Sequence, residues 1–183
     1  FPYKYATDKP WEKVITDLIP DFVKANHLLS YHKAVLKMSA SIDDGHGGVY
    51  PFMHATLSGK YNPPFYFKLI DNKAVITKII DTQEVKKAGI LTGSVIEKIN
   101  GISIKKRVQD FWDCVPASNK VGKYRDLHAF ILNSAQTSAV YSGYNPDRTR
   151  FSSSMKLREG NFLKEFLEFH EMNNPIISKM VTN

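Results

Sequence analysis

The stretch VKKAGILTGSVIEKING, residues 85–101, decides the fold. Gly89 and Gly93 permit backbone conformations that a Cβ disfavours, so they predict bends in the chain around these positions. The pair Asn100-Gly101 is a strong signal for a tight turn between two strands. The strand before this turn is predicted from its β-branched apolar residues, which are Val95, Ile96 and Ile99. We therefore expect sheet structure on both sides of the stretch.

Alternating apolar residues extend the predicted sheet in both directions along the chain. A hairpin is expected upstream, with strands over 65–70 and 74–80 and a turn at 71–73. Further strands are expected downstream at 102–104, 138–144 and 150–157. Apolar residues at helical spacing predict helices over 120–132 and 162–172.

The first forty residues have a helical period instead. Apolar residues from Trp11 to Ile19 follow the spacing i, i+3, i+4, i+7 and i+8, which predicts a helix with one apolar stripe. Pro20 and Asp21 predict the end of this helix and the start of a second one, which continues to Ser39. The glycines that follow predict the end of the helical unit, and they are Gly45, Gly47 and Gly48.

The composition is that of an ordinary folded protein. With 183 residues, 43% of them hydrophobic and 23% charged, the chain is not expected to be disordered. No apolar run approaches the roughly 18 to 20 residues that span a bilayer. Cys114 is the single cysteine, so neither an internal disulfide nor a cysteine-based zinc cluster is expected.

The chain is basic, with 25 Lys and Arg against 18 Asp and Glu, a formal charge of +7. A nucleic-acid-binding face requires basic residues that cluster on one surface or alternate with stacking aromatic residues. The basic residues here are scattered along the sequence. This favours a solvated basic surface, and no nucleic-acid partner is expected.

Residues 85–101 resemble the PDZ-domain pattern AG(L/I)xxGDxIxxING. The departure is Ser94, where that family usually has aspartate; serine makes the same local hydrogen bond less strongly. The resemblance implies a fold in which an extended polypeptide is added as a strand at a sheet edge. Backbone amides at the start of the edge strand then receive the terminal carboxylate of that polypeptide.

By position, the resemblance places the carboxylate loop and the edge strand over residues 64–67 and a lining helix over 120–132. The peptide-binding residues that it implies are Phe65, Tyr66, Phe67, Tyr124, Leu127 and Ile131. The same apolar side chains also suit the core of a small barrel, because a groove and a core need apolar residues at the same spacing. For Leu127 and Ile131 both readings stay open.

The flanking segments look like those of the tail-specific (C-terminal processing) and tricorn-type serine peptidases. The similarity rests on residues 3–14 and on Asp43-Asp44-Gly45-His46-Gly47, before the PDZ-like segment. It implies an α+β protein with an N-terminal helical unit over 1–48, a PDZ-like, partly open β-barrel with flanking helices over 55–158, and a linker helix over 159–183. The family's catalytic domain would follow, and it is the missing partner of this chain.

The same resemblance implies the substrate-binding portion of a bacterial serine endopeptidase, located in the periplasm or secreted. Its partner would be a substrate polypeptide or the C-terminus of one, and no cofactor is implied. Because the nucleophilic serine of the family lies in a later part of the sequence, the chain is expected to be inactive by itself. The alternative is a stand-alone PDZ adaptor that binds the C-termini of partner proteins.

His46 is the candidate catalytic residue. In the tricorn branch the histidine of this turn is the general base, whereas the C-terminal processing branch uses serine and lysine. A turn flanked by glycines leaves an imidazole accessible, and imidazole exchanges protons near neutral pH. The acidic group that would orient the ring is expected from the missing domain. In the alternative reading, His46 bonds local backbone and Asp44 caps the end of a helix.

A metal site and a reactive cysteine are both disfavoured. Zinc ligand types occur at Asp43, Asp44, His46 and His54, but their spacing presets no geometry, so no metal is expected. Cys114 lies in a largely apolar stretch and is expected to pack as a small apolar residue.

Overall fold

The computed structural model describes residues 9–49 and 54–160, and two of the predicted hairpins lie at its centre. β2 (Phe65–Ile70) pairs with β3 (Lys73–Ile79), and β4 (Val95–Ile99) pairs with β5 (Ile102–Ser103), each antiparallel. In each turn both central residues have positive φ, as a type I′ hairpin requires. These residues are Asp71, Asn72, Asn100 and Gly101.

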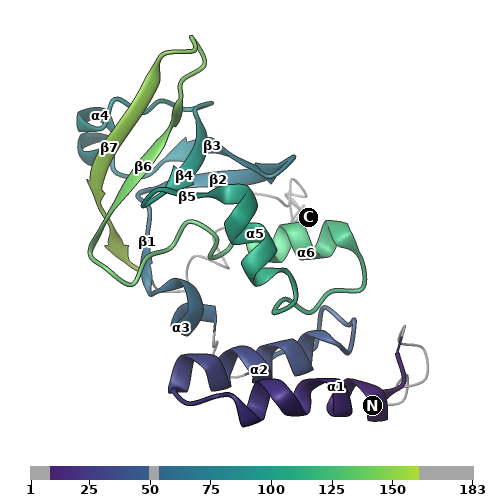
Figure 1. Cartoon of the computed structure of the whole chain (residues 1–183). Coiled ribbons are helices and arrows are strands. Elements are labelled where there is room, and N and C mark those ends of the chain that lie inside the picture. The colour runs from purple at the N-terminus through teal and green to yellow at the C-terminus, as the bar shows by residue number, and fades with distance from the viewer. Residues whose placement is uncertain (1–8, 50–53, 161–183) are drawn as a thin grey trace, which may run out of the picture.

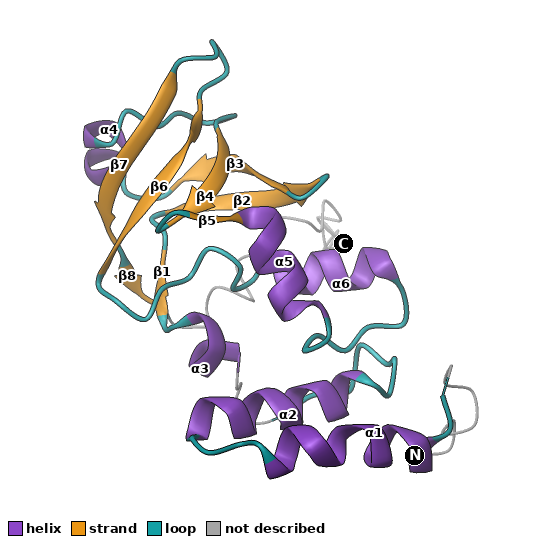
Figure 2. Ribbon diagram, in the orientation of Figure 1, coloured by secondary structure: helices purple, strands orange, loops and turns teal. Residues whose placement is uncertain are grey.

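The main sheet is antiparallel and is not closed into a barrel. Its strand order is β2-β3-β4-β6-β7, with β5 paired to β4 beside this path. β6 (Ser138–Tyr144) and β7 (Arg150–Lys156) agree with the predicted strand pair. A separate two-stranded sheet joins β1 (Tyr61–Asn62) to β8 (Arg158–Glu159). The α+β class is therefore confirmed (Figure 2).

The helical unit consists of α1 (Trp11–Val23) and α2 (Leu28–Ala40). The predicted break at Pro20 is wrong, because α1 continues through this proline. The Asp21 carboxylate accepts a hydrogen bond of 2.6 Å from Lys37 Nζ, so it links α1 to α2 instead of starting a helix. α2 starts at Leu28 because the His27 imidazole accepts the amide of Ser30 and caps the first turn.

Four further helices belong to the part of the chain around the sheet. They are α3 (His54–Ser58), α4 (Thr82–Lys87), α5 (Ile104–Trp112) and α6 (Lys120–Leu127). α4 and α5 were not predicted, and α6 ends five residues earlier than expected. The helix predicted over 162–172 lies outside the described residues. None of the helices in the described ranges is both long enough and apolar enough to cross a membrane.

The arrangement places α5 and α6 between the two ends of the molecule. Figure 1 shows the α1–α2 pair at one end and the main sheet at the other. α4 lies against β7. The sheet core is completed from α5, α6 and the turns after α6, through Val108, Leu127, Phe130 and Ile131.

A cluster of polar side chains connects residues 85–101 to the turn between β6 and β7 by hydrogen bonds. The Ser94 hydroxyl donates to Asn145 Oδ1 at 2.6 Å and accepts the Leu91 amide. Asn145 Nδ2 donates to the Gly89 carbonyl at 2.9 Å and to Thr149 Oγ1 at 3.1 Å. Ser94 thus makes the local turn bond that the family's aspartate would make, and it is fully buried while doing so.

Replacing Asn145 by alanine is expected to lower the free energy of unfolding by about 2–3 kcal/mol, because it leaves the buried Ser94 hydroxyl without its acceptor and removes the hydrogen bond to the Gly89 carbonyl. Urea denaturation measures the effect. Thr149→Val removes one exposed partner of the same amide and is expected to cost less than about 1 kcal/mol. Equal losses in the two variants would contradict this assignment.

Candidate peptide-binding and catalytic sites

β2 is the edge of the main sheet at which a polypeptide strand can add. The other outer strand, β7, is covered by α4, because Ser153 Oγ donates to the Ala88 carbonyl at 2.9 Å. The Lys156 amide on the same strand donates to Glu84 Oε2 at 3.4 Å. Within the described part of the chain, β2 pairs only with β3. The edge strand expected within residues 64–67 therefore corresponds to the first part of β2.

The side chains of β2 divide between core and surface. Phe65 and Phe67 are buried in the sheet core, with Phe65 edge-on to Tyr141 and Phe67 edge-on to His128. Tyr66 lies between them and is partly exposed. A polypeptide strand added to β2 would contact the β2 backbone and Tyr66. Phe65 and Phe67 would not contact it, because they pack in the core of the sheet.

Leu127 and Ile131 are fully buried. Of the two positions that the sequence allowed for them, peptide groove or core, the structure places them in the core. The physical reason is that 120–132 is not one helix. α6 ends at Leu127, and the chain then turns into the core. Arg107 of α5 holds this turn in place by donating to the carbonyls of Ile131 at 2.7 Å and Asn133 at 3.0 Å. Leu127 and Ile131 could contact a bound peptide only if this turn moved.

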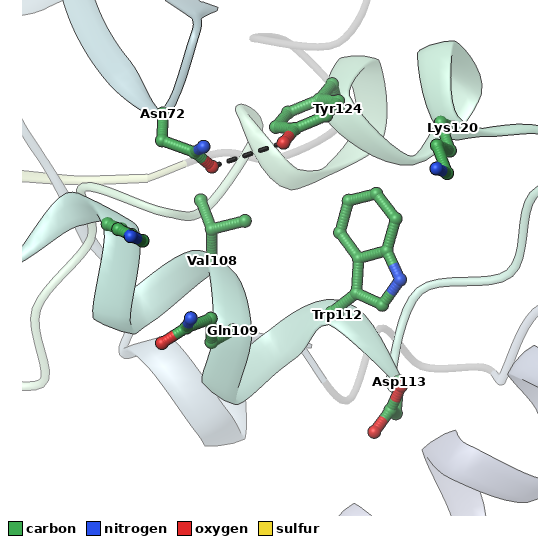
Figure 3. A pocket seen from close by; sticks show the side chains of 8 residues that line it. Asn72, Val108, Gln109, Trp112, Asp113, Lys120 and Tyr124 are labelled. Atoms are coloured by element: carbon green, nitrogen blue, oxygen red, sulfur yellow. Dashed lines mark hydrogen bonds between the residues drawn. The ribbon is translucent and has the colours of Figure 1, made fainter.

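Tyr124 is the exception among the expected helix residues, because it borders a cavity. Its hydroxyl donates to Asn72 Oδ1 at 3.2 Å, and its ring is edge-on to Trp112. The cavity has a volume of about 380 Å³ and lies between α5, α6 and the β2–β3 turn. Figure 3 shows the Tyr124 hydroxyl directed at Asn72 and the Trp112 side chain extending from α5 toward α6. Sequence reasoning missed this site because it missed α5.

His46 lies in a turn between α2 and the sheet domain, and its side chain is 99% exposed. The His46 amide donates to Asp44 Oδ1 at 2.9 Å, and the ring Nδ1 lies 3.0 Å from the same oxygen. These two hydrogen bonds hold the pKa of the Asp44 carboxyl below its usual value. Because an ionised carboxylate can only accept, the contact requires the proton on Nδ1. Nε2 is then the acceptor nitrogen and faces solvent.

The hydrogen bonds differ from the alternative in which His46 bonds local backbone and Asp44 caps the end of a helix. Both contacts of His46 are to the Asp44 carboxylate, and the C-cap residue of α2 is Ser41. The ring contact places a carboxylate oxygen 3.0 Å from Nδ1 of His46, which is where the acidic group that orients a general base lies. The turn lies beside the 113–119 loop and α6, since a Cβ added to Gly47 would lie 3.9 Å from Pro116 Cβ.

The remaining candidates are the possible metal ligands and Cys114. Within 9–49 and 54–160, no group of three His, Cys, Asp or Glu side chains is arranged to hold a metal ion. Cys114 is fully buried, and burial raises the pKa of its thiol to about 11.

Cys114 is therefore expected to be inert in the folded protein. At pH 8 only roughly one thiol in a thousand would be ionised, and the thiolate is the reactive form. A disulfide reagent such as dithionitrobenzoate should label one thiol per chain in 6 M guanidinium and none in the native protein on the same timescale. Rapid stoichiometric labelling of the native protein would refute this assignment.

Comparison with known proteins gives structural similarity only. No family model matches the chain, and no curated protein matches it in sequence. Mature CPAF, a tail-specific protease, matches 85% of the chain with a TM-score of 0.58 and 9% identity. A serine-to-alanine mutant of CPAF matches 89% with a TM-score of 0.57 and 10% identity. The photosystem II D1 C-terminal processing protease matches 87% with a TM-score of 0.36 and 14% identity.

The CPAF matches show a shared fold and extend over most of the described residues. The chain spans only 30% to 33% of the length of those CPAF structures. The part of the chain around the sheet extends from α3, which begins at His54, to β8, which ends at Glu159. A match to 85% of the 183 residues is longer than this part, so it also includes residues outside it.

Proposed function

We propose that the chain is the substrate-binding, PDZ-like portion of a serine endopeptidase of the tail-specific/tricorn type, and that it contributes His46 as the general base, as the histidine of this turn does in the tricorn branch. The single observation that carries the proposal is the exposed Asp44–His46 pair at the junction of the helical unit and the sheet domain. The fold shared with mature CPAF supports it.

The chemistry follows from the orientation of the ring. Asp44 fixes the Nδ1–H tautomer, so Nε2 can accept the proton of a serine hydroxyl as that oxygen attacks a peptide carbonyl. The same nitrogen then returns the proton to the leaving amine. No serine hydroxyl is bonded to His46 within the described ranges, so the nucleophile would come from outside them.

Substrate presentation would use the edge of β2. A polypeptide paired with this strand gains main-chain hydrogen bonds, which bind any sequence in extended conformation. The adjoining Tyr66 and the cavity beside Tyr124 would supply the side-chain contacts. Extracytoplasmic location, periplasmic or secreted, is part of the same proposal and follows the family resemblance.

The test compares the 183-residue chain with the complete protein that contains it, using an unfolded, disulfide-free polypeptide as substrate. The proposal expects the chain to bind the polypeptide without cleaving it and the complete protein to cleave it at internal bonds. A stand-alone adaptor would bind and leave the polypeptide intact in both cases. Cleavage by the 183-residue chain itself would refute the division of labour proposed here.

A further inference from the structure

We infer that the cavity between α5 and α6 binds an acidic side chain of an internal substrate segment, and that the chain does not select a free C-terminus. This inference rests on the proposed function and deepens it, because it names the substrate class that the β2 edge presents. Three features of the described residues carry it: the charge of the cavity, its aromatic wall, and the chemistry at the start of β2.

The charged residues that line the cavity are two lysines and one aspartate, so its lining carries a net positive charge. Lys105 and Lys120 both line it, and neither forms an ion pair or hydrogen bond with a described residue. The neighbouring Lys106 differs, since it is paired with Asp110. The cavity also contains one carboxylate, Asp113, which Figure 3 shows at the far end from Asn72. An acidic side chain that enters the cavity would therefore meet two ammonium groups and one carboxylate among its lining residues.

The wall between these lysines is aromatic. The rings of Trp112 and Tyr124 are 5.3 Å apart, and Lys123 Nζ lies 5.3 Å from the centre of the Trp112 ring. Gln109 adds an amide with no hydrogen-bond partner among the described residues. Aromatic faces cover the apolar stem of a Glu or Asp side chain, while the amide and ammonium groups can donate to its carboxylate.

The start of β2 cannot receive a terminal carboxylate in the way the resemblance implies. Pro63 and Pro64 precede the strand and have no amide hydrogen to donate. The Pro64 carbonyl is oriented into the sheet, where it accepts the amides of Ile80 and Asp81. The preceding residue pair, Tyr61 and Asn62, is already paired with β8. Phe65 is therefore the first residue at this end with an amide to donate, so a free C-terminus gains little over an internal segment.

The cavity lies where a segment bound along β2 would emerge. β2 has six residues, a length of about 20 Å, and the β2–β3 turn follows it directly. Asn72 belongs to that turn and also lines the cavity. A segment extended along the strand therefore places a side chain beside the cavity after about six residues.

The test measures binding of doubly blocked peptides, acetylated and amidated, to the 183-residue chain carrying Trp11→Phe. This substitution leaves Trp112 as the only tryptophan, since the chain has two, and its emission reports on the cavity. An acidic peptide with Glu and Asp at one end is compared with its Gln and Asn counterpart, and with that neutral peptide bearing a free C-terminal carboxylate. We expect the acidic blocked peptide to bind at least about tenfold more tightly than both others.

Charge reversal locates the site. Lys105→Glu with Lys120→Glu is expected to weaken binding of the acidic peptide by at least about tenfold. The matched control, Lys86→Glu with Lys98→Glu, changes the net charge equally at exposed positions on α4 and β4 and should change binding less than about twofold. Circular dichroism of both variants confirms that each is folded.

Several results would overturn the inference. These are equal binding of acidic and neutral peptides, preference for the free carboxylate, equal loss in the control variant, and displacement of the peptide by an equimolar single-stranded oligonucleotide. The outcomes also separate this inference from the proposed function. Equal cleavage of acidic and neutral polypeptides by the complete protein refutes only the inference. Tight binding of acidic polypeptides by the complete protein, with no cleavage, refutes only the peptidase assignment.

Discussion

Replacing His46 by glutamine in the complete protein is expected to lower kcat/KM for polypeptide cleavage by about a thousandfold or more. The reason is that a serine hydroxyl is a weak nucleophile until a base removes its proton, and Nε2 of His46 is the acceptor oriented by Asp44. Glutamine keeps the polarity of this exposed position and removes the base. Steady-state kinetics with a fluorogenic peptide measures the loss.

Two further variants make the result specific to His46. Asp44→Asn keeps an oxygen that can accept the His46 amide but removes the charge that fixes the ring, so a loss of up to about ten-thousandfold is expected. His27→Asn removes another histidine while leaving a good helix cap at the start of α2, and it should leave kcat/KM unchanged. A loss of less than about tenfold in His46→Gln would contradict the assigned role.

Replacing Gly143 by alanine is expected to lower the free energy of unfolding by more than about 3 kcal/mol, or to prevent folding. Gly143 lies in β6 opposite Ile96, where the register of β4 against β6 shifts. A Cβ at this position would lie 1.9 Å from the Val95 carbonyl oxygen. Because this oxygen belongs to a central strand, relief requires the two strands to separate.

Gly45→Ala is the matched control for this clash. A Cβ there would come no closer than 3.9 Å to any neighbour, the Arg125 side chain, so the expected change is within about 0.5 kcal/mol. Urea denaturation at pH 7 gives both values. A Gly143→Ala protein as stable as the control would show that β4 and β6 are not packed at this distance.

The sheet was predictable from the sequence because its signals are local. Asn100-Gly101 and the alternation through 65–70 and 138–144 specify turn type and strand period without reference to the rest of the chain. α5 was missed because a strand was expected at 102–104. The helix instead begins at Ile104, where the Ser103 hydroxyl accepts the Lys106 amide. Pro20 was misread because tertiary pairing to α2 outweighs the loss of one helical hydrogen bond.

The candidate site was predictable only in part. The Asp43-Asp44-Gly45-His46-Gly47 motif identified the histidine, but spacing alone does not determine whether a carboxylate two residues away bonds to the ring. The cavity beside Tyr124 is lined by residues from α5, α6 and the β2–β3 turn. Tyr124 and Asn72, which are hydrogen-bonded across it, lie 52 positions apart in the sequence. Such a site depends on tertiary structure, and no local pattern in the sequence encodes it.

The central claim, that His46 activates a serine nucleophile, is tested most directly by acylation with a fluorophosphonate, because this reagent reports on the nucleophile without requiring polypeptide binding. The rate of covalent labelling is measured in the complete protein and in His46→Gln. We predict that one serine is labelled and that the variant reacts at least about a hundredfold more slowly. Equal labelling rates in the two proteins, with the same serine modified, would contradict the account.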